Sequence, residues 1–259
     1  MNASFKDLVI RLKNELGRQL ELGLTLLEGD GFIQIESSES TKKIFLYPNE
    51  RRLRFLSIDS GIHIDEDQLE QKFDLIVQRI VAQSINNRRI YARKTVVARL
   101  DKKVSQQFLL EHHLQTPILG KYRYGLYEQG ELVSIAIFSG GRRMNDKDDA
   151  YRSFELLRFC NKSGYNVIGG LSKLIKAFVK DFSPGDIMTY TDRDWNQDSS
   201  LEKIGFIAKE ITAPIHFWVT GANRYAYRTE DELKALIAQV PIGFPKENLG
   251  SIKMILYIK

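Results

Sequence analysis

The residues best suited to chemistry lie between Tyr151 and Val179, where a predicted strand, a glycine pair and a predicted helix follow one another. The strand covers Phe154–Phe159, the turn covers Val167–Gly170, and the helix repeats apolar residues at three- and four-residue spacing. Glycines before a helix let backbone N–H groups approach a ligand, and the helix dipole there favours an anion such as phosphate. A glycine pair that only makes a tight turn is the alternative.

Three side chains are candidate catalytic groups. Glu155 lies on the predicted strand and is a candidate general base, or else a structural carboxylate paired with an arginine. Asp192 ends the predicted strand Ile187–Thr191, where α/β sheets place ligand contacts, although a turn or helix cap is the alternative. His113 ends a predicted helix and is a candidate base near neutral pH, or else a histidine that interacts with the helix dipole.

Basic residues gather at 88–94 and at Arg142-Arg143, within a chain whose net charge is +5. Such clusters attract phosphate, of a nucleic acid or of a cofactor, although a solvated basic face is the alternative. Trp195, which follows Arg193 after the predicted strand Ile187–Thr191, could stack on a base or could be a packed ring. The candidate nucleic-acid contacts are Arg88, Arg89, Arg93, Lys94, Arg142, Arg143, Arg193 and Trp195.

The composition excludes several classes of protein. Hydrophobic residues make up 43% of the 259 residues, which is enough for a real core. Cys160 is the one cysteine in the sequence and the histidines lack metal-ligand spacing, so we expect no disulfide and no metal site. No apolar run approaches the roughly 20 residues of a membrane helix. Charged residues interrupt the amphipathic N-terminus, so we expect no signal peptide and a cytoplasmic protein.

The elements that position these residues fall into two predicted modules. Residues 1–87 form a small α/β module, with helices over 5–22 and 67–84 around strands at 32–35, 44–47, 53–58 and 62–64. Residues 88–259 form the second, of α/β class and α+β type. Its expected elements are strand 95–100, helix 103–112, hairpin 122–127 and 131–139, a loop at 140–150, the strand, turn and helix described above, strand 187–191, helix 199–204, and strands 206–210 and 216–220.

This order of elements resembles the GNAT acyltransferase superfamily. The resemblance implies a mixed central sheet flanked by helices, and acetyl-CoA or another acyl-CoA held on the glycine loop and helix start. The loop VIGGLSK lacks the family's leading Gln or Arg, and Leu201 stands where relatives often have a general-acid tyrosine. The cofactor contacts that the resemblance implies are Leu157, Phe159, Val167, Ile168, Gly169, Gly170, Leu171, Ser172 and Lys173.

Further strings resemble a phage and mobile-element group of Mom-like DNA-modification proteins, often fused to a nuclease-like N-terminal domain. The matching strings are IYARK (90–94), FLLEHHLQ (108–115), YGLYEQGELVS (124–134), FELLRFCNK (154–162), VIGGLSKL (167–174) and YTDRDW (190–195). The acidic and Glu-x-Lys pattern of such a nuclease is not found upstream, which favours a degenerate or unrelated N-terminal scaffold.

The resemblance therefore implies an N-acyltransferase that uses acyl-CoA and acts on nucleic acid or another amine. The alternative is a non-catalytic protein of the same fold that binds nucleic acid or a partner of a mobile element. A gap between the strands of Leu156 and Ile187, with room for the pantetheine arm of CoA, would favour the enzyme. A shared fold does not by itself settle function.

Overall fold

The computed structural model describes residues 3–49, 61–83, 88–195, 200–221 and 223–258. The chain forms two compact units, each built from separate stretches. The first takes residues 1–77, 192–198 and 211–252; the second takes residues 78–191, 199–210 and 253–259. The sequence patterns predicted two contiguous modules with a boundary at residue 87. Local periodicity identifies helices and strands, but it does not show where a later stretch of chain returns to an earlier unit. The predicted strand at 53–58 lies outside the described residues.

The first unit contains a four-stranded sheet in the order β1-β2-β3-β4. Strand β3 pairs antiparallel with β2 and parallel with β4. Helix α1 buries Phe5, Val9, Leu12 and Leu16, the three- and four-residue spacing of one apolar face. The bounds are α1 Ala3–Leu20, β1 Thr25–Gly29, β2 Phe32–Ser37, β3 Ser40–Tyr47, β4 Gly61–Asp65 and α2 Glu66–Ala82.

A later stretch of chain adds a three-stranded sheet to the first unit, in the order β15-β14-β16. Helix α6 begins after Thr229, whose hydroxyl accepts a hydrogen bond from the Glu232 N–H. The short 3₁₀ turn η2 also belongs to this unit. The bounds are η2 Arg193–Trp195, β14 His216–Thr220, β15 Asn223–Tyr227, α6 Glu230–Gln239 and β16 Phe244–Glu247.

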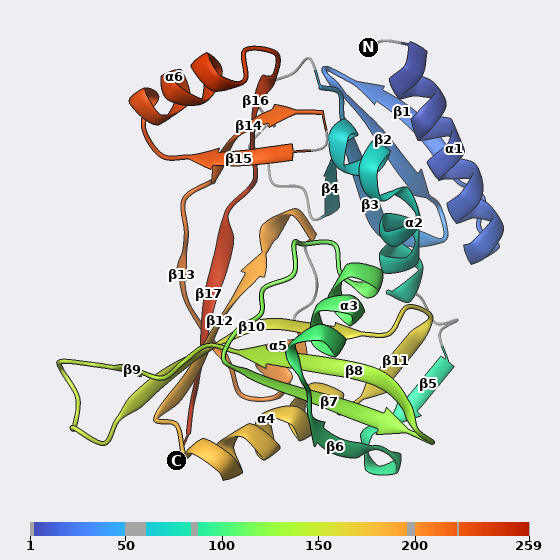
Figure 1. Cartoon of the computed structure of the whole chain (residues 1–259). Coiled ribbons are helices and arrows are strands. Elements are labelled where there is room, and N and C mark those ends of the chain that lie inside the picture. The colour runs from blue at the N-terminus through green and yellow to red at the C-terminus, as the bar shows by residue number, and fades with distance from the viewer. Residues whose placement is uncertain (1–2, 50–60, 84–87, 196–199, 222, 259) are drawn as a thin grey trace. The chain divides into compact units, whose positions relative to one another are not determined.

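The second unit is built on a mixed sheet whose main path is β13-β17-β12-β10-β8-β7-β6 (Figure 1). Strand β9 pairs with β10 off this path, and β5 and β11 form a separate parallel pair. The bounds are β5 Arg88–Tyr91, η1 Ala92–Lys94, β6 Val96–Arg99, α3 Lys102–His112, β7 Tyr122–Glu128, β8 Glu131–Phe138, β9 Arg142–Arg143, β10 Arg152–Asn161, β11 Tyr165–Ile168, α4 Gly170–Phe182, β12 Asp186–Asp192, α5 Ser200–Lys203, β13 Ile207–Ile211 and β17 Ser251–Tyr257.

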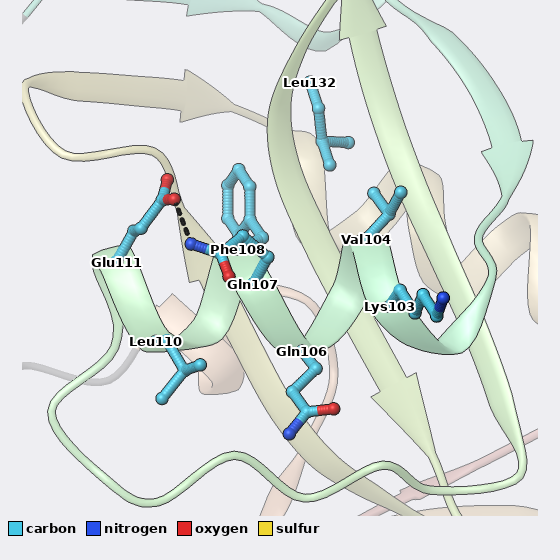
Figure 2. Close-up of a pocket in the computed structure, with 8 residues that line it drawn as sticks. All are labelled: Lys103, Val104, Gln106, Gln107, Phe108, Leu110, Glu111 and Leu132. Atoms are coloured by element: carbon cyan, nitrogen blue, oxygen red, sulfur yellow. Dashed lines mark hydrogen bonds between the residues drawn. The ribbon is translucent and has the colours of Figure 1, made fainter.

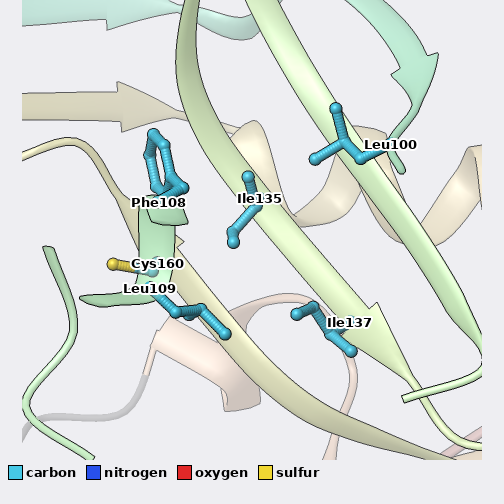
Figure 3. Close-up of a cluster of buried hydrophobic side chains, with 6 residues drawn as sticks. All are labelled: Leu100, Phe108, Leu109, Ile135, Ile137 and Cys160. Atoms are coloured by element: carbon cyan, nitrogen blue, oxygen red, sulfur yellow. The ribbon is translucent and has the colours of Figure 1, made fainter. Parts of the chain in front are cut away.

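Helices α3 and α4 cover opposite faces of this sheet, and two adjacent residues of β8 show which helix covers each face. Phe138 stacks on Phe178 of α4, with ring centroids 4.0 Å apart. Its neighbour Ile137 instead joins Leu109 of α3 in a buried cluster (Figure 3). Because successive side chains of a strand point to opposite faces, α3 and α4 lie on opposite sides of the sheet. The predicted mixed sheet flanked by helices is confirmed.

The structure corrects several details of the sequence prediction. Val167 and Ile168, predicted as turn residues, belong to β11 and pair with Ile90 and Tyr91 of β5. The predicted loop at 140–150 contains β9, and β1, α6 and β15 to β17 were not predicted at all. Strand β17 lies inside the main sheet between β12 and β13, so the C-terminal extension is part of the core architecture. The pairing of β5 with β11 and of β12 with β17 joins residues distant in sequence, which short-range patterns do not register.

Candidate functional site

The site begins where β10 and β12 separate. These parallel neighbours pair over three residues only, from Ser153 with Asp186 to Glu155 with Met188. The register of β10 on β8 then shifts between Leu156 and Arg158, which marks a β-bulge. Beyond Glu155, the edge of β10 that faces away from β8 has no strand partner among the described residues. Its backbone is therefore open to hydrogen bonds from something other than the sheet.

The bulge brings a carboxylate and a guanidinium to the α3 face of the sheet. Leu156 is opposite Phe138 and so lies on the α4 face, which sends its neighbour Glu155 to the α3 face. Arg158 is opposite Ile137, which belongs to the cluster on α3, so Arg158 shares that face. Without the bulge, residues 155 and 158 would point to opposite faces of the strand.

Glu155 is held by its backbone and is half-buried. Its N–H donates to Ser139 Oγ at 2.8 Å, and its carbonyl accepts from the Ser139 N–H at 2.9 Å. No described residue donates a hydrogen bond to its carboxylate. Burial raises the pKa of Glu155, and the positive charges of Arg158 and Arg142 oppose that rise. A carboxylate with a raised pKa and free oxygens suits a general base.

The start of α4 fits an anionic group. Gly169 has a φ of +75° and precedes the first helical residue, and no side chain caps this helix end. A Cβ at Gly169 would meet nothing nearer than the Ala92 side chain at 3.7 Å, so the space in front of the helix is open. Uncapped N–H groups and the helix dipole together suit the pyrophosphate of a nucleotide cofactor such as CoA.

Lys173 has a structural role beside this helix end. Its ammonium donates to the carbonyl of Ala92 at 2.8 Å and to the carbonyl of Thr95, which ties the first turn of α4 to η1. The ammonium is therefore already occupied by two acceptors. Of the other predicted cofactor contacts, Leu157, Phe159 and Ser172 are half-buried, Val167, Gly170 and Leu171 are buried, and Ile168 is exposed.

The basic segment 88–94 runs directly beside the start of α4, because β5 pairs with β11. Arg88 forms an ion pair with Glu128 at 3.5 Å and packs over the Tyr165 ring. Arg93 lies over the Tyr91 ring at 5.1 Å. The side chains of Arg89 and Lys94 are exposed. In the β9 region, Arg142 is exposed and Arg143 pairs with Asp149. A nucleic-acid role for these residues stays a prediction.

Asp192, Arg193 and Trp195 belong to the first unit, whereas Glu155 belongs to the second. The Asp192 carboxylate accepts from the Asp194 N–H at 3.0 Å, the turn role that was the alternative. Arg193 donates to the Leu249 carbonyl at 2.8 Å. The Trp195 ring is buried at 7% exposure, as a packed tryptophan would be.

His113 is the C-cap residue of α3. Its N–H donates to the Leu109 carbonyl, and its ring Nδ1 accepts from the Gln115 N–H at 3.1 Å. The ring is therefore tied to the loop that follows the helix. The role of His113 as a catalytic base stays a prediction.

Sequence reasoning missed Tyr190. Met188 pairs with Glu155, and Tyr190 is two residues further along β12, so both side chains share the α3 face. The Tyr190 ring is 42% exposed, and its hydroxyl makes no hydrogen bond with the described residues. The alternation of the segment IMTYTD carries this signal, but the face of each residue becomes known only once the neighbour of β12 is known.

No group of three or more His, Cys, Asp or Glu side chains in the described parts of the chain could hold a metal ion. None of the helices described is long and apolar enough to cross a membrane. A surface groove of about 640 Å³ lies along α3 and Leu132 (Figure 2), and none of its lining residues is a predicted site residue.

Comparison with known proteins finds distant likenesses among solved structures and none by sequence. No protein-family model and no curated protein matches the sequence. The solved structures it resembles include the ribosomal-protein-S18-alanine N-acetyltransferase of Escherichia coli, at 13% identity and a TM-score of 0.39, over 64% of this chain and 94% of that one. A GNAT-family acetyltransferase of Elizabethkingia anophelis with acetyl-CoA bound gives 12% identity and a TM-score of 0.36, over 64% and 99%.

Proposed function

We propose that this protein is a GNAT-like N-acyltransferase that binds an acyl-CoA along β10 and at the start of α4. The observation that carries the proposal is the separation of β10 from β12 after Glu155. It leaves the edge of residues 157–161 that faces away from β8 without a strand partner among the described residues, and this open edge offers hydrogen bonds to the amides of a pantetheine arm. The uncapped N-terminus of α4 offers N–H groups for the pyrophosphate.

The bound acyl-CoA supplies an activated acyl group, whose bond to sulfur breaks as its bond to the amine nitrogen forms, and the released thiolate takes a proton. Glu155 accepts the proton that the amine loses, directly or through a water. Tyr190, whose exposed side chain lies on the same face, donates the proton to the thiolate in this proposal. This is the role that the resemblance gives to a tyrosine at the position of Leu201, whose side chain carries no hydroxyl.

The acceptor is an amine, and nucleic acid is one source of it. The exposed basic residues of β5 and η1 support contact with phosphate near the start of α4. The resemblance to Mom-like DNA-modification proteins of phages and mobile elements points the same way. Acetylation of oligonucleotides is therefore part of the acceptor screen.

The test is a calorimetric titration of acetyl-CoA into the purified protein and two variants. Gly169→Asp places a carboxylate at the helix start, where it repels a phosphate, and Asp tolerates a positive φ better than most residues. Gly169→Asn is the matched control, of the same shape but uncharged. We expect Asn to retain most of the affinity and Asp to lose at least about tenfold, the order of one charge interaction at a helix end. Equal affinities in the two variants, or no binding by the parent protein, would remove the proposed donor site.

A non-catalytic binding protein of the same fold is the second candidate. Leu201 in place of tyrosine and the engagement of Lys173 by two backbone carbonyls favour it. Such a protein would bind DNA with a strong salt dependence, would bind no acetyl-CoA, and would transfer no acyl group.

A further inference from the structure

Arg158 is a half-buried arginine on the same face as Glu155. Its Nη1 donates to the Leu157 carbonyl at 2.7 Å and its Nη2 to the Thr116 carbonyl at 3.5 Å. Its Nε is buried and has no hydrogen-bond partner among the described residues. Burial lowers the pKa of Arg158, and the negative charge of Glu155 opposes that change. An unpaired N–H on a half-buried guanidinium has a free-energy cost, so an anion that accepts hydrogen bonds from this group would be stabilised there.

Glu155 does not act as that anion. The two side chains influence each other electrostatically, yet the ion pairs of the described residues include none between them. The bulge sets them on one face without bringing them into contact. The face therefore offers one negative and one positive group, each with unused capacity, on either side of Leu157.

We propose that the acceptor is a small amine that carries its own anionic group, a carboxylate or a phosphate monoester, which Arg158 binds while the amine nitrogen lies toward Glu155. This inference rests on the proposed function, because it concerns the acceptor of the same transfer. An arginine fork matches both carboxylate and phosphate oxygens through paired N–H donors. Binding of the anion by Arg158 would fix the distance between the amine and the base, which is the positioning that acyl transfer needs.

The competing explanation is that Arg158 only holds the loop after α3 through the Thr116 carbonyl. A residue with that role stabilises the protein, and its loss affects all amines alike. Discrimination between amines of similar size with and without an anionic group is therefore the property that separates the two explanations.

The experiment compares matched amines as acceptors with saturating acetyl-CoA, following release of the free thiol. The pairs are glycine with glycinamide, and 2-aminoethyl phosphate with ethanolamine; a single-stranded oligonucleotide is a separate arm. We expect the anionic member of a pair to have a KM lower by about 10- to 100-fold, the worth of a hydrogen bond to a charged group. The pair that shows the difference identifies the anion as carboxylate or phosphate.

Variants connect the preference to Arg158. In Arg158→Gln the KM ratio within the pair falls toward one, and in Arg158→Lys part of it returns, since lysine keeps the charge but not the fork. Lys176→Gln is the control of equal charge change: this exposed residue of α4 lies on the opposite side of the sheet and leaves the ratio unchanged. Thermal melting and acetyl-CoA affinity of each variant report whether the fold and the donor site survive.

The outcomes separate this inference from the proposed function. If acetyl-CoA does not bind, the proposed function fails and the inference fails with it. If acetyl-CoA binds but each pair reacts equally, or the oligonucleotide alone reacts, the acyltransferase stands and the small anionic acceptor is refuted. If no amine turns over, titration of the same pairs onto the acetyl-CoA complex decides, and equal affinities overturn the role of Arg158.

Discussion

Thr189 Oγ1 of β12 donates a 2.9 Å hydrogen bond to the Leu156 carbonyl of β10, just past the last residue pair that joins the two strands. Both residues are buried. The side chain thus completes the hydrogen bonding of a carbonyl that the parallel ladder no longer reaches. The point at which β10 and β12 separate is defined by this contact.

We expect Thr189→Val to lower the free energy of unfolding by about 1–3 kcal/mol, because it leaves the buried Leu156 carbonyl without its donor. Chemical denaturation with urea measures the change. Thr189→Ser keeps the hydroxyl and is expected to lose much less. If Val and Ser are equally stable, the hydrogen bond does not hold the strands at this point.

Replacement of Glu155 by glutamine tests its role as general base. Glutamine keeps the shape but cannot accept the amine proton, so we expect kcat to fall by about 10²- to 10⁴-fold. Acetyl-CoA affinity, measured by calorimetry, is expected to change little. A variant with normal kcat would show that another group or water alone takes the proton.

The pKa of Glu155 also predicts two pH dependences. Because burial raises this pKa, kcat/KM is expected to increase with pH through the raised value as the carboxylate ionises, and Glu155→Gln is expected to lack that rise. The raised pKa means that the folded state favours the protonated form. Stability relative to Glu155→Gln is therefore expected to fall as pH rises through the raised pKa. Rate profiles and urea titrations across the acidic range measure both, and profiles that coincide for the two proteins would contradict the assignment.

Cys160 is expected to be inert in the native protein. Burial raises the pKa of its thiol to about 12, and the side chain packs in the cluster with Leu109 and Ile135. Very little thiolate is then present near neutral pH, and thiolate is the reactive form. Mass spectrometry after iodoacetamide treatment should show no alkylation until the protein is unfolded. Rapid modification of the native protein would place the thiol at the surface.

Arg224 joins two carboxylates in the interior of the first unit. It donates to Asp67 at 2.6 and 2.7 Å and to Asp65 at 2.8 Å, and both carboxylates are fully or almost fully buried. We expect Arg224→Met to cost about 3–5 kcal/mol in unfolding free energy, since the buried Asp67 carboxylate loses its guanidinium while Asp65 keeps Lys246 at 3.5 Å. The exposed Arg228→Met is the control, with little expected change. Similar melting temperatures for the two variants would refute the importance of this network.

The sequence alone determined the local elements and the class of the fold. The apolar spacing of α4, the alternation of β7 and β8, and Gly169 before a helix are local properties of the chain, fixed by helix and strand periodicity and by the freedom of glycine at positive φ. From these the order of elements and the helix start that suits an anion could be predicted, and the mixed sheet was expected from the resemblance of that order to a known superfamily.

The tertiary structure decided which chemical groups meet. A strand pattern gives two faces but not which neighbour lies beside each, so Tyr190 could not be assigned to the face of Glu155 before β12 was placed next to β10. The bulge that brings Arg158 to that face arises from pairing with β8, which local patterns do not contain. The pairing of Arg224 with Asp67 spans 157 residues and depends on the return of the chain to the first unit. Such long-range contacts are set by burial and by the satisfaction of backbone and charged groups over the whole fold, and these forces leave only weak traces in any short segment of sequence.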